Sequence, residues 1–221
     1  MIKVAFLFDK LNDWIARYLP EKLLNTNGFC FNEIYDERNV RGFDIVFVIG
    51  YTKILKGEIL KSNKLLLVVH ESDLPNGKGF APIQWQILKG VNEITVCLLE
   101  LVDKIDSGNI YEKYNLSLDG TELYDEIRSK QANATFELIA NFLSKYPNCY
   151  SSPQVGKYSV AAPALLSEQR AIALTLNDVD ALLLQHGAEE RDQLIVAFDD
   201  RGVSNGSRPV RSGVFNIVLE A

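Results

Sequence analysis

The feature that most constrains the fold is a regular alternation of strand-like and helix-like segments over the first 145 residues. Short apolar runs predict buried strands, and the segments between them carry apolar residues at helical spacing. Strands separated by helices are typical of an α/β fold whose sheet is mostly parallel and covered by helices on both faces, so we predict a Rossmann-like sheet. The predicted strands are residues 2–8, 31–35, 44–49, 65–69, 94–101 and 110–118, and the predicted helices are residues 11–24, 52–60, 82–88 and 121–143.

The composition changes abruptly after about residue 157. Residues 1–157 contain 14 lysines, whereas residues 158–221 contain none and are richer in alanine. We therefore predict a catalytic domain over residues 1–150 and a small C-terminal α+β segment over residues 158–221. In that segment the pattern predicts a helix at residues 176–185 and strands at residues 194–198 and 214–219.

Composition and charge exclude several classes of protein. No apolar stretch approaches the roughly 20 residues that cross a bilayer, so we expect no membrane span. A net charge of −6 argues against a broad cationic surface for nucleic acid. The three cysteines lack metal-binding spacing, and the N-terminus lacks a signal-peptide cleavage site, so we expect no metal and a cytoplasmic location.

The stretch from residue 68 to residue 110 carries the candidate chemistry. His70 ends a predicted strand, a glycine-rich loop containing Lys78 follows it, and Asp106 lies in a polar turn after a later strand. A histidine and an aspartate on neighbouring loops at one sheet edge can pair, and the carboxylate then orients the imidazole. Each feature alone is weak, because strand-end histidines, Gly-Lys-Gly loops and Asp-x-Gly turns are common in structural roles.

Taken in order, these residues resemble the catalytic domain of the folate-dependent formyltransferases. The family pattern is a strand ending in Asn-x-His, then Ser-x-Leu-Pro, a glycine-rich loop, a helix begun by proline, a further strand and Asp-x-Gly-x-Ile. The resemblance covers about residues 1–150, and HESDLPNGKG with TELYDEIR downstream looks most like the nucleotide-sugar N-formyltransferases of the pseudaminic-acid type. The matching positions are His70, Ser72, Leu74, Pro75, Gly79, Pro82, Trp85, Asp106, Gly108 and Ile110.

The resemblance implies a donor, an acceptor and a set of site residues. The donor is N10-formyltetrahydrofolate, the acceptor is a primary amine on a nucleotide-linked amino-deoxy sugar, and no metal takes part. His70 takes the amine proton or stabilises the intermediate, and Asp106 holds the imidazole. The expected folate-binding residues are Gly50, Leu74, Val102 and Ile105. The expected acceptor-side residues are Glu71, Ser72, Lys78, Gly79 and Trp85, and Trp85 has packing as its alternative role.

One position departs from the family pattern. The asparagine that lies two residues before the histidine, and that donates a hydrogen bond to the formyl oxygen, is Val68 here. Loss of one such donor typically lowers the rate by about 10²–10³-fold. A slow or non-catalytic homologue that binds folate or a nucleotide sugar is therefore one alternative. Methionyl-tRNA or glycinamide ribonucleotide as the acceptor is another, and a homodimer is compatible with the sequence.

Overall fold

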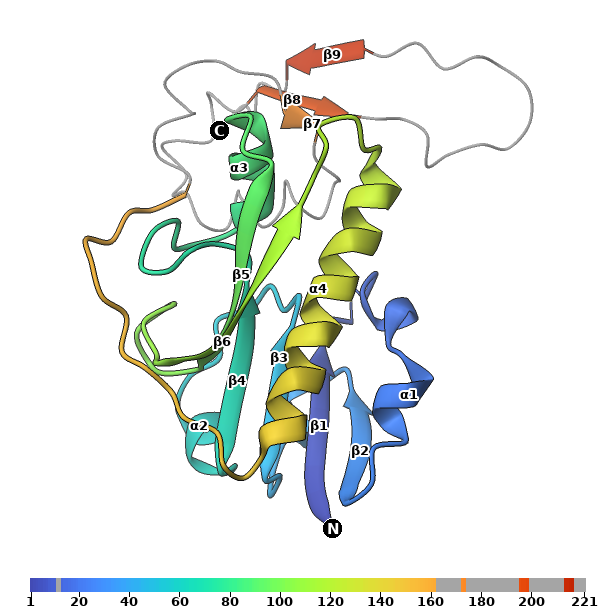
Figure 1. Ribbon diagram of the computed structural model, residues 1–221, viewed down its shortest axis with the longest axis vertical. Helices are drawn as coiled ribbons and strands as arrows, with labels where there is room; N and C mark the ends of the chain where they lie inside the picture. Colours follow the sequence, from blue (N-terminus) through green and yellow to red (C-terminus); the bar gives the residue numbers. More distant parts are fainter. Residues whose placement is uncertain (11–12, 162–171, 174–194, 199–212, 217–221) are drawn as a thin grey trace.

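The computed structural model describes residues 1–10 and 13–161, together with three short strands further along the chain (Figure 1). The main body contains a six-stranded sheet in the order β2-β1-β3-β4-β5-β6. The pairs β1–β2, β1–β3 and β3–β4 are parallel, whereas β5 runs antiparallel to β4 and β6 antiparallel to β5. The strands are β1 (Ile2–Phe8), β2 (Phe29–Ile34), β3 (Ile45–Ile49), β4 (Leu65–His70), β5 (Glu93–Glu100) and β6 (Ile110–Ser117).

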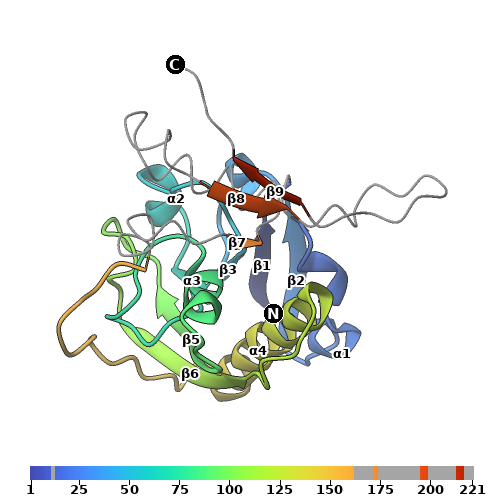
Figure 2. The ribbon, with the colours of Figure 1, turned by 90° about the horizontal axis from the view of Figure 1, so that it is seen from above.

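Both faces of this sheet are covered, as the prediction of a mostly parallel α/β sheet requires. One face packs against the long helix α4 (Tyr124–Lys145), as Figures 1 and 2 show. On this face the Phe142 ring contacts the rings of Phe47 and Tyr111. The other face carries a smaller apolar cluster that includes Leu7, Val46 and Leu66. The short helix α2 (Glu58–Lys61) and the loops around it contribute the covering side chains of that cluster. The predicted fold class is confirmed.

The helices agree with the predictions less well than the strands do. Helix α3 (Pro82–Leu88) has the predicted bounds, with proline in its first turn. In place of the helix predicted at residues 11–24, the described part contains a 3₁₀ turn, η1 (Ala16–Tyr18), and a four-residue helix, α1 (Glu21–Leu24). Pro20 separates the two elements, because the residue before a proline is disfavoured in the helical conformation. The helix predicted at residues 52–60 forms only as α2, after Gly57 with a φ of 72°.

Helix α4 begins later than predicted. The prediction started it at residue 121, but the helix starts after Leu123, whose backbone N–H donates to the Glu126 carboxylate at 2.8 Å. Asp119 accepts hydrogen bonds from Thr121 in the preceding turn. No helix in the described part of the chain is both long enough and apolar enough to span a membrane.

The C-terminal part contains a separate three-stranded sheet made of β7 (Ile172–Ala173), β8 (Ile195–Phe198) and β9 (Gly213–Asn216). Strands β7 and β8 are parallel, and β9 is antiparallel to β8. Strands β8 and β9 overlap the two strands predicted there, whereas the helix predicted at residues 176–185 lies outside the described residues. The division into residues 1–150 and 158–221 stays a prediction.

Candidate active site

The candidate site lies where the parallel strands end. Gly50 follows β3 and His70 ends β4, and because these strands are parallel neighbours their carboxyl ends meet at one edge of the sheet. A cavity of about 410 Å³ opens there, lined by His70 and Asp106. His70 is buried and Asp106 is partly buried, with 7% of the His70 side chain and 13% of the Asp106 side chain exposed. The end of β4 and the turn after β5 therefore place one histidine and one carboxylate in the same cavity.

The imidazole and the carboxylate face each other without a direct hydrogen bond. His70 Nδ1 lies 3.8 Å from Asp106 Oδ1, and His70 Nε2 lies 2.9 Å from the carbonyl oxygen of Gly77. A proton on Nε2 satisfies that carbonyl, which leaves Nδ1 as the basic atom beside the carboxylate. The arrangement therefore suits a histidine that accepts a proton at Nδ1, because the resulting positive charge faces Asp106.

The Gly-Lys-Gly loop supports this pair through its backbone. The Gly77 carbonyl binds His70, and the Gly79 N–H donates to Asp106 Oδ2 at 2.9 Å. Gly77 has a φ of 72°, and a Cβ atom there would lie 3.0 Å from the Cβ of Ser72. The loop therefore requires glycine at this position, and its polar backbone groups hold the two candidate catalytic side chains.

The Asp106 turn is also sterically restricted. Asp106 adopts a left-handed conformation with a φ of 47°, and a Cβ atom on Gly108 would lie only 1.9 Å from the carbonyl oxygen of Glu100. Lys78 Nζ donates to Ser107 Oγ at 2.8 Å and so connects the glycine-rich loop to this turn. Burial lowers the pKa of the Lys78 ammonium, while the nearby Asp106 carboxylate acts in the opposite direction.

Helix α4 adds a polar wall to the cavity. The Gln131 amide donates to the Glu71 carboxylate, and the Gln131 carbonyl oxygen accepts from Arg128 at 3.0 Å. The Arg128 guanidinium lies 4.4 Å from the ring centre of Trp14 and 5.0 Å from that of Tyr124. All of these side chains except Tyr124 line the cavity. The site therefore contains a fixed carboxylate immediately after His70, held by a buried amide.

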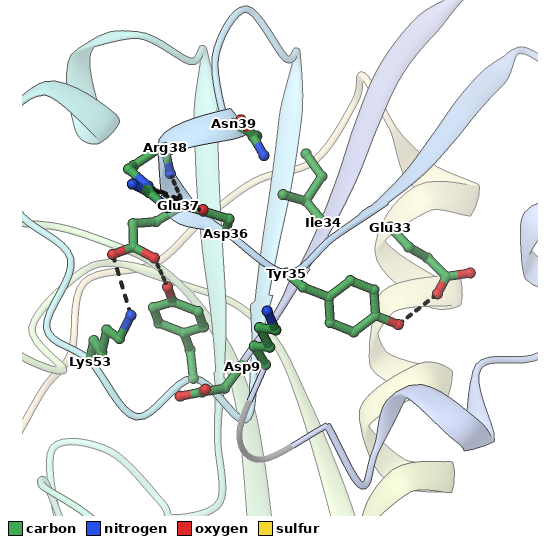
Figure 3. A pocket seen from close by; sticks show the side chains of 11 residues that line it. Asp9, Glu33, Ile34, Tyr35, Asp36, Glu37, Arg38, Asn39 and Lys53 are labelled. Atoms are coloured by element: carbon green, nitrogen blue, oxygen red, sulfur yellow. Dashed lines mark hydrogen bonds and ion pairs between the residues drawn. The ribbon is translucent and has the colours of Figure 1, made fainter.

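A second cavity, of about 620 Å³, adjoins the first at the ends of β1 and β2. Tyr51 and Lys53 line both cavities, and both interact with Glu37, whose side chain points toward Lys53 in Figure 3. Burial, followed by the hydrogen bond to Glu37, raises the pKa of the Tyr51 phenol. Many of the residues that line this second cavity are charged, and they also include Asp9, Lys10, Glu33, Asp36 and Arg38.

The formyl transferase family model matches residues 10–143. The chain belongs to this family. It is 31% identical over 159 residues to methionyl-tRNA formyltransferase of Rickettsia africae, an alignment that covers 72% of this chain and 50% of the relative. The chain therefore spans about half the length of the curated relatives it matches. The resemblance to folate-dependent formyltransferases seen in the sequence is confirmed.

Solved structures share the fold. Methionyl-tRNA formyltransferase from Clostridium thermocellum matches with a TM-score of 0.63 and 18% identity, over 89% of this chain and 88% of that one. The formyltransferase PseJ from Anoxybacillus kamchatkensis, solved with UDP-4,6-dideoxy-4-formamido-L-AltNAc and tetrahydrofolate, matches with a TM-score of 0.52 and 17% identity, over 72% and 84% of the two chains. At these identities the structures establish the fold and leave the acceptor to be argued from the site.

The structure brings seven of the predicted site residues to the main cavity and places four elsewhere. Leu74 packs with Cys97 and Leu99 in a small apolar cluster, and Trp85 is 1% exposed. Ser72 donates to the backbone of Asn76, and Lys78 is turned toward the Asp106 turn. The seven that line the cavity are Gly50, His70, Glu71, Gly79, Val102, Ile105 and Asp106.

Sequence reasoning missed the residues that α4 contributes. Arg128 and Gln131 are each 5% exposed, and Thr135 continues the same buried face. The available signal was a set of polar residues spaced by three and four positions within the apolar stripe of an amphipathic helix. Within residues 1–10 and 13–161, no group of three or more His, Cys, Asp or Glu side chains is placed to hold a metal ion.

Proposed function

We propose that the chain transfers a formyl group from N10-formyltetrahydrofolate to the primary amine of a nucleotide-linked amino-deoxy sugar. The observation that carries this proposal is the pair of His70 and Asp106 in the cavity of a formyl transferase domain, beside the fixed carboxylate of Glu71. The PseJ structure, solved in complex with tetrahydrofolate and a formamido sugar nucleotide, supports the same pair of substrates.

The folate donor supplies the formyl group, and the remaining tasks belong to the chain's own residues. As the new C–N bond forms, the amine loses a proton, and His70 accepts it at Nδ1. Asp106 stabilises the resulting positive charge, and the Gly77 carbonyl keeps the ring in place. His70 then returns the proton to the departing folate nitrogen, so the histidine ends the cycle in its starting form.

The lining of the cavity offers different surfaces to the two substrates. Val102 and Ile105 provide an apolar wall suited to the flat pterin ring, and Gly50 adds a stretch of backbone there. Glu71 offers a carboxylate to the acceptor's ammonium or hydroxyl groups, and the hydrogen bond from Gln131 fixes its orientation. Gly79 also lines the cavity, whereas Lys78 lies outside its lining and donates to Ser107 in the Asp106 turn.

Val68 lies next to this machinery. It lines the cavity and occupies the same face of β4 as His70. Its side chain cannot donate a hydrogen bond, so the developing negative charge on the formyl oxygen must be met by other donors, among them backbone N–H groups or a protonated His70. We therefore propose an active enzyme whose chemical step is slower than that of relatives with asparagine at this position.

Methionyl-tRNA is the second candidate acceptor, because curated relatives that the chain matches are methionyl-tRNA formyltransferases. The acidic net charge of −6 argues against it, since a long phosphate backbone favours a cationic partner. We further propose that the enzyme works in the cytoplasm without a metal ion. A homodimer is the alternative to a monomer, and sedimentation of the purified chain distinguishes them.

The test is a direct formyl-transfer assay. The purified full chain is incubated with N10-formyltetrahydrofolate and a panel of amino-sugar nucleotides, including 4-amino-4,6-dideoxy sugars, and products are read by the mass of one added formyl group. A parallel reaction contains methionyl-tRNA, and His70→Asn is the matched control. Transfer to a sugar that His70→Asn abolishes supports the proposal, whereas transfer to methionyl-tRNA alone refutes it.

A further inference from the structure

After α4 the chain turns back and crosses both loops that carry the catalytic pair. Ser152 and Ile110 exchange two backbone hydrogen bonds of 2.8 Å, which fix the start of this crossing against β6. Further on, Ala161 donates to the Lys78 carbonyl at 2.9 Å, which fixes its end against the glycine-rich loop. Residues 152–161, here called the strap, therefore span the region between the two candidate catalytic loops.

On the aspartate side, the strap contributes Gln154. Its Nε2 donates to the carbonyl oxygens of Asp106 and Gly108, at 2.9 Å in each case. These two carbonyls flank the turn in which Asp106 has its left-handed φ of 47°. A left-handed conformation is unfavourable for residues other than glycine, so the turn keeps it only where its surroundings hold it.

On the histidine side, the strap contributes Ser159. Its Oγ accepts from the Gly77 N–H at 3.0 Å, and its carbonyl oxygen accepts from the Lys78 N–H at 2.9 Å. The carbonyl of the same Gly77 holds His70 Nε2. Ser159 is therefore separated from the His70 imidazole by a single peptide group, the one that joins Gly77 and Lys78. Gln154 is likewise separated from the Asp106 carboxylate only by the backbone of Asp106.

We propose that Gln154 is a positioning residue for formyl transfer: it holds the Asp106 turn so that the carboxylate faces the His70 ring, and Ser159 holds the glycine-rich loop from the other side. This inference rests on the proposed function. It places part of the active-site scaffold after residue 150, beyond the predicted limit of the catalytic domain.

The hydrogen bonding of Gln154 favours positioning over simple packing. Within the described residues, its Oε1 is buried and has no hydrogen-bond partner, whereas its Nε2 serves two carbonyls. A buried acceptor without a partner is unfavourable, and an apolar side chain of similar size would avoid that penalty. The amide is useful at this position because its two N–H groups reach both ends of one turn.

The test uses the full chain with Gln154→Leu, which keeps the approximate size and removes both donors, and Gln154→Glu, which replaces the donors with a carboxylate. We expect kcat to fall by about 10–100-fold in each, because small displacements of catalytic groups have effects of this order. The KM for the folate donor should change less than about twofold. Val155→Ala is the matched control, since Val155 is the next residue on the strap and is 85% exposed.

A double-mutant cycle separates positioning from general damage. If Gln154 acts through the carboxylate, Gln154→Leu should lower the rate by less than about twofold further in the Asp106→Asn background. An undiminished additional loss in that background overturns the proposal, as does a wild-type kcat in Gln154→Leu alone. Gln154→Glu, which also removes both donors to the Asp106 turn, carries the same test if Gln154→Leu fails to fold.

Amide hydrogen exchange gives a readout that does not depend on catalysis. The Gly79 N–H donates to the Asp106 carboxylate, so its exchange should become at least about tenfold faster in Gln154→Leu and stay unchanged in Val155→Ala. Unchanged exchange at Gly79 overturns the positioning role even if the enzyme proves inactive on every acceptor. Faster exchange in a chain without formyl transfer supports the positioning role and refutes only the proposed function.

Discussion

Substitution of Asp106 by asparagine tests the central pair most directly. The carbonyl oxygen of the introduced amide can still accept from the Gly79 N–H, and the amide N–H₂ then faces His70 Nδ1 in place of a negative charge. Two unit charges about 4 Å apart interact by about 4 kcal/mol at an effective dielectric constant near 20, which corresponds to a factor of about 10³ in rate. Because solvent near the cavity screens part of this interaction, we expect formyl transfer to slow by about 10²–10³-fold.

Single-turnover formyl transfer measures this loss without interference from product release. Folate affinity, measured by calorimetry with a stable folate analogue, should change less than about twofold, because the proposed pterin wall is apolar. Asp73→Asn is the matched control, since Asp73 lies on the preceding loop with a side chain that is 62% exposed. If Asp106→Asn keeps a near-normal rate while His70→Asn is inactive, the pairing argument is refuted and Asp106 is only a turn residue.

Three further substitutions test the surroundings of the pair. Val68→Asn should leave turnover unchanged or raise it, because the residue lines the cavity and the new amide can donate to the formyl oxygen; a fall in kcat at unchanged stability contradicts this. Gln131→Leu should raise the KM for the acceptor by about 10-fold without changing donor affinity, because a hydrogen bond to the Glu71 carboxylate is lost; equal effects on both substrates would argue against an acceptor role. Gly108→Ala should lower the free energy of unfolding by about 3 kcal/mol or more in urea denaturation, because the added Cβ meets the Glu100 carbonyl; wild-type stability would refute the steric argument.

The strands were predictable because their signal is local. Runs such as the five fully buried residues of β3 leave little choice of structure, and all six strands of the main sheet lie within a few residues of their predicted ranges. Helix α3 was equally clear, because Pro82 fixes its first turn. The structure of residues 52–60 was not clear from the sequence, because a short apolar pattern fits a loop packed on a sheet as well as a helix. Packing against the sheet decided between the two.

The candidate catalytic residues were predictable through their order along the chain. Histidine, serine, leucine, proline and the glycines follow one another in an order that resembles a family pattern, so His70 and Asp106 stand out without knowledge of the fold. The wall formed by Arg128 and Gln131 was not predictable in this way. Its residues lie on a helix about 60 positions after His70, and only the packing of α4 on the sheet brings them to the cavity.

The sequence by itself determined the alternation that makes an α/β sheet, the strand that ends at His70, and the glycines that its turns require. These features depend on neighbours within a few residues, where backbone sterics and side-chain periodicity act. Only the tertiary structure decided that the imidazole and the carboxylate stand 3.8 Å apart, and that Gln154 and Ser159 hold the two loops. Those contacts of Gln154 and Ser159 join residues 48 and 82 positions apart, and their geometry depends on how the whole sheet and α4 pack, which no local pattern encodes.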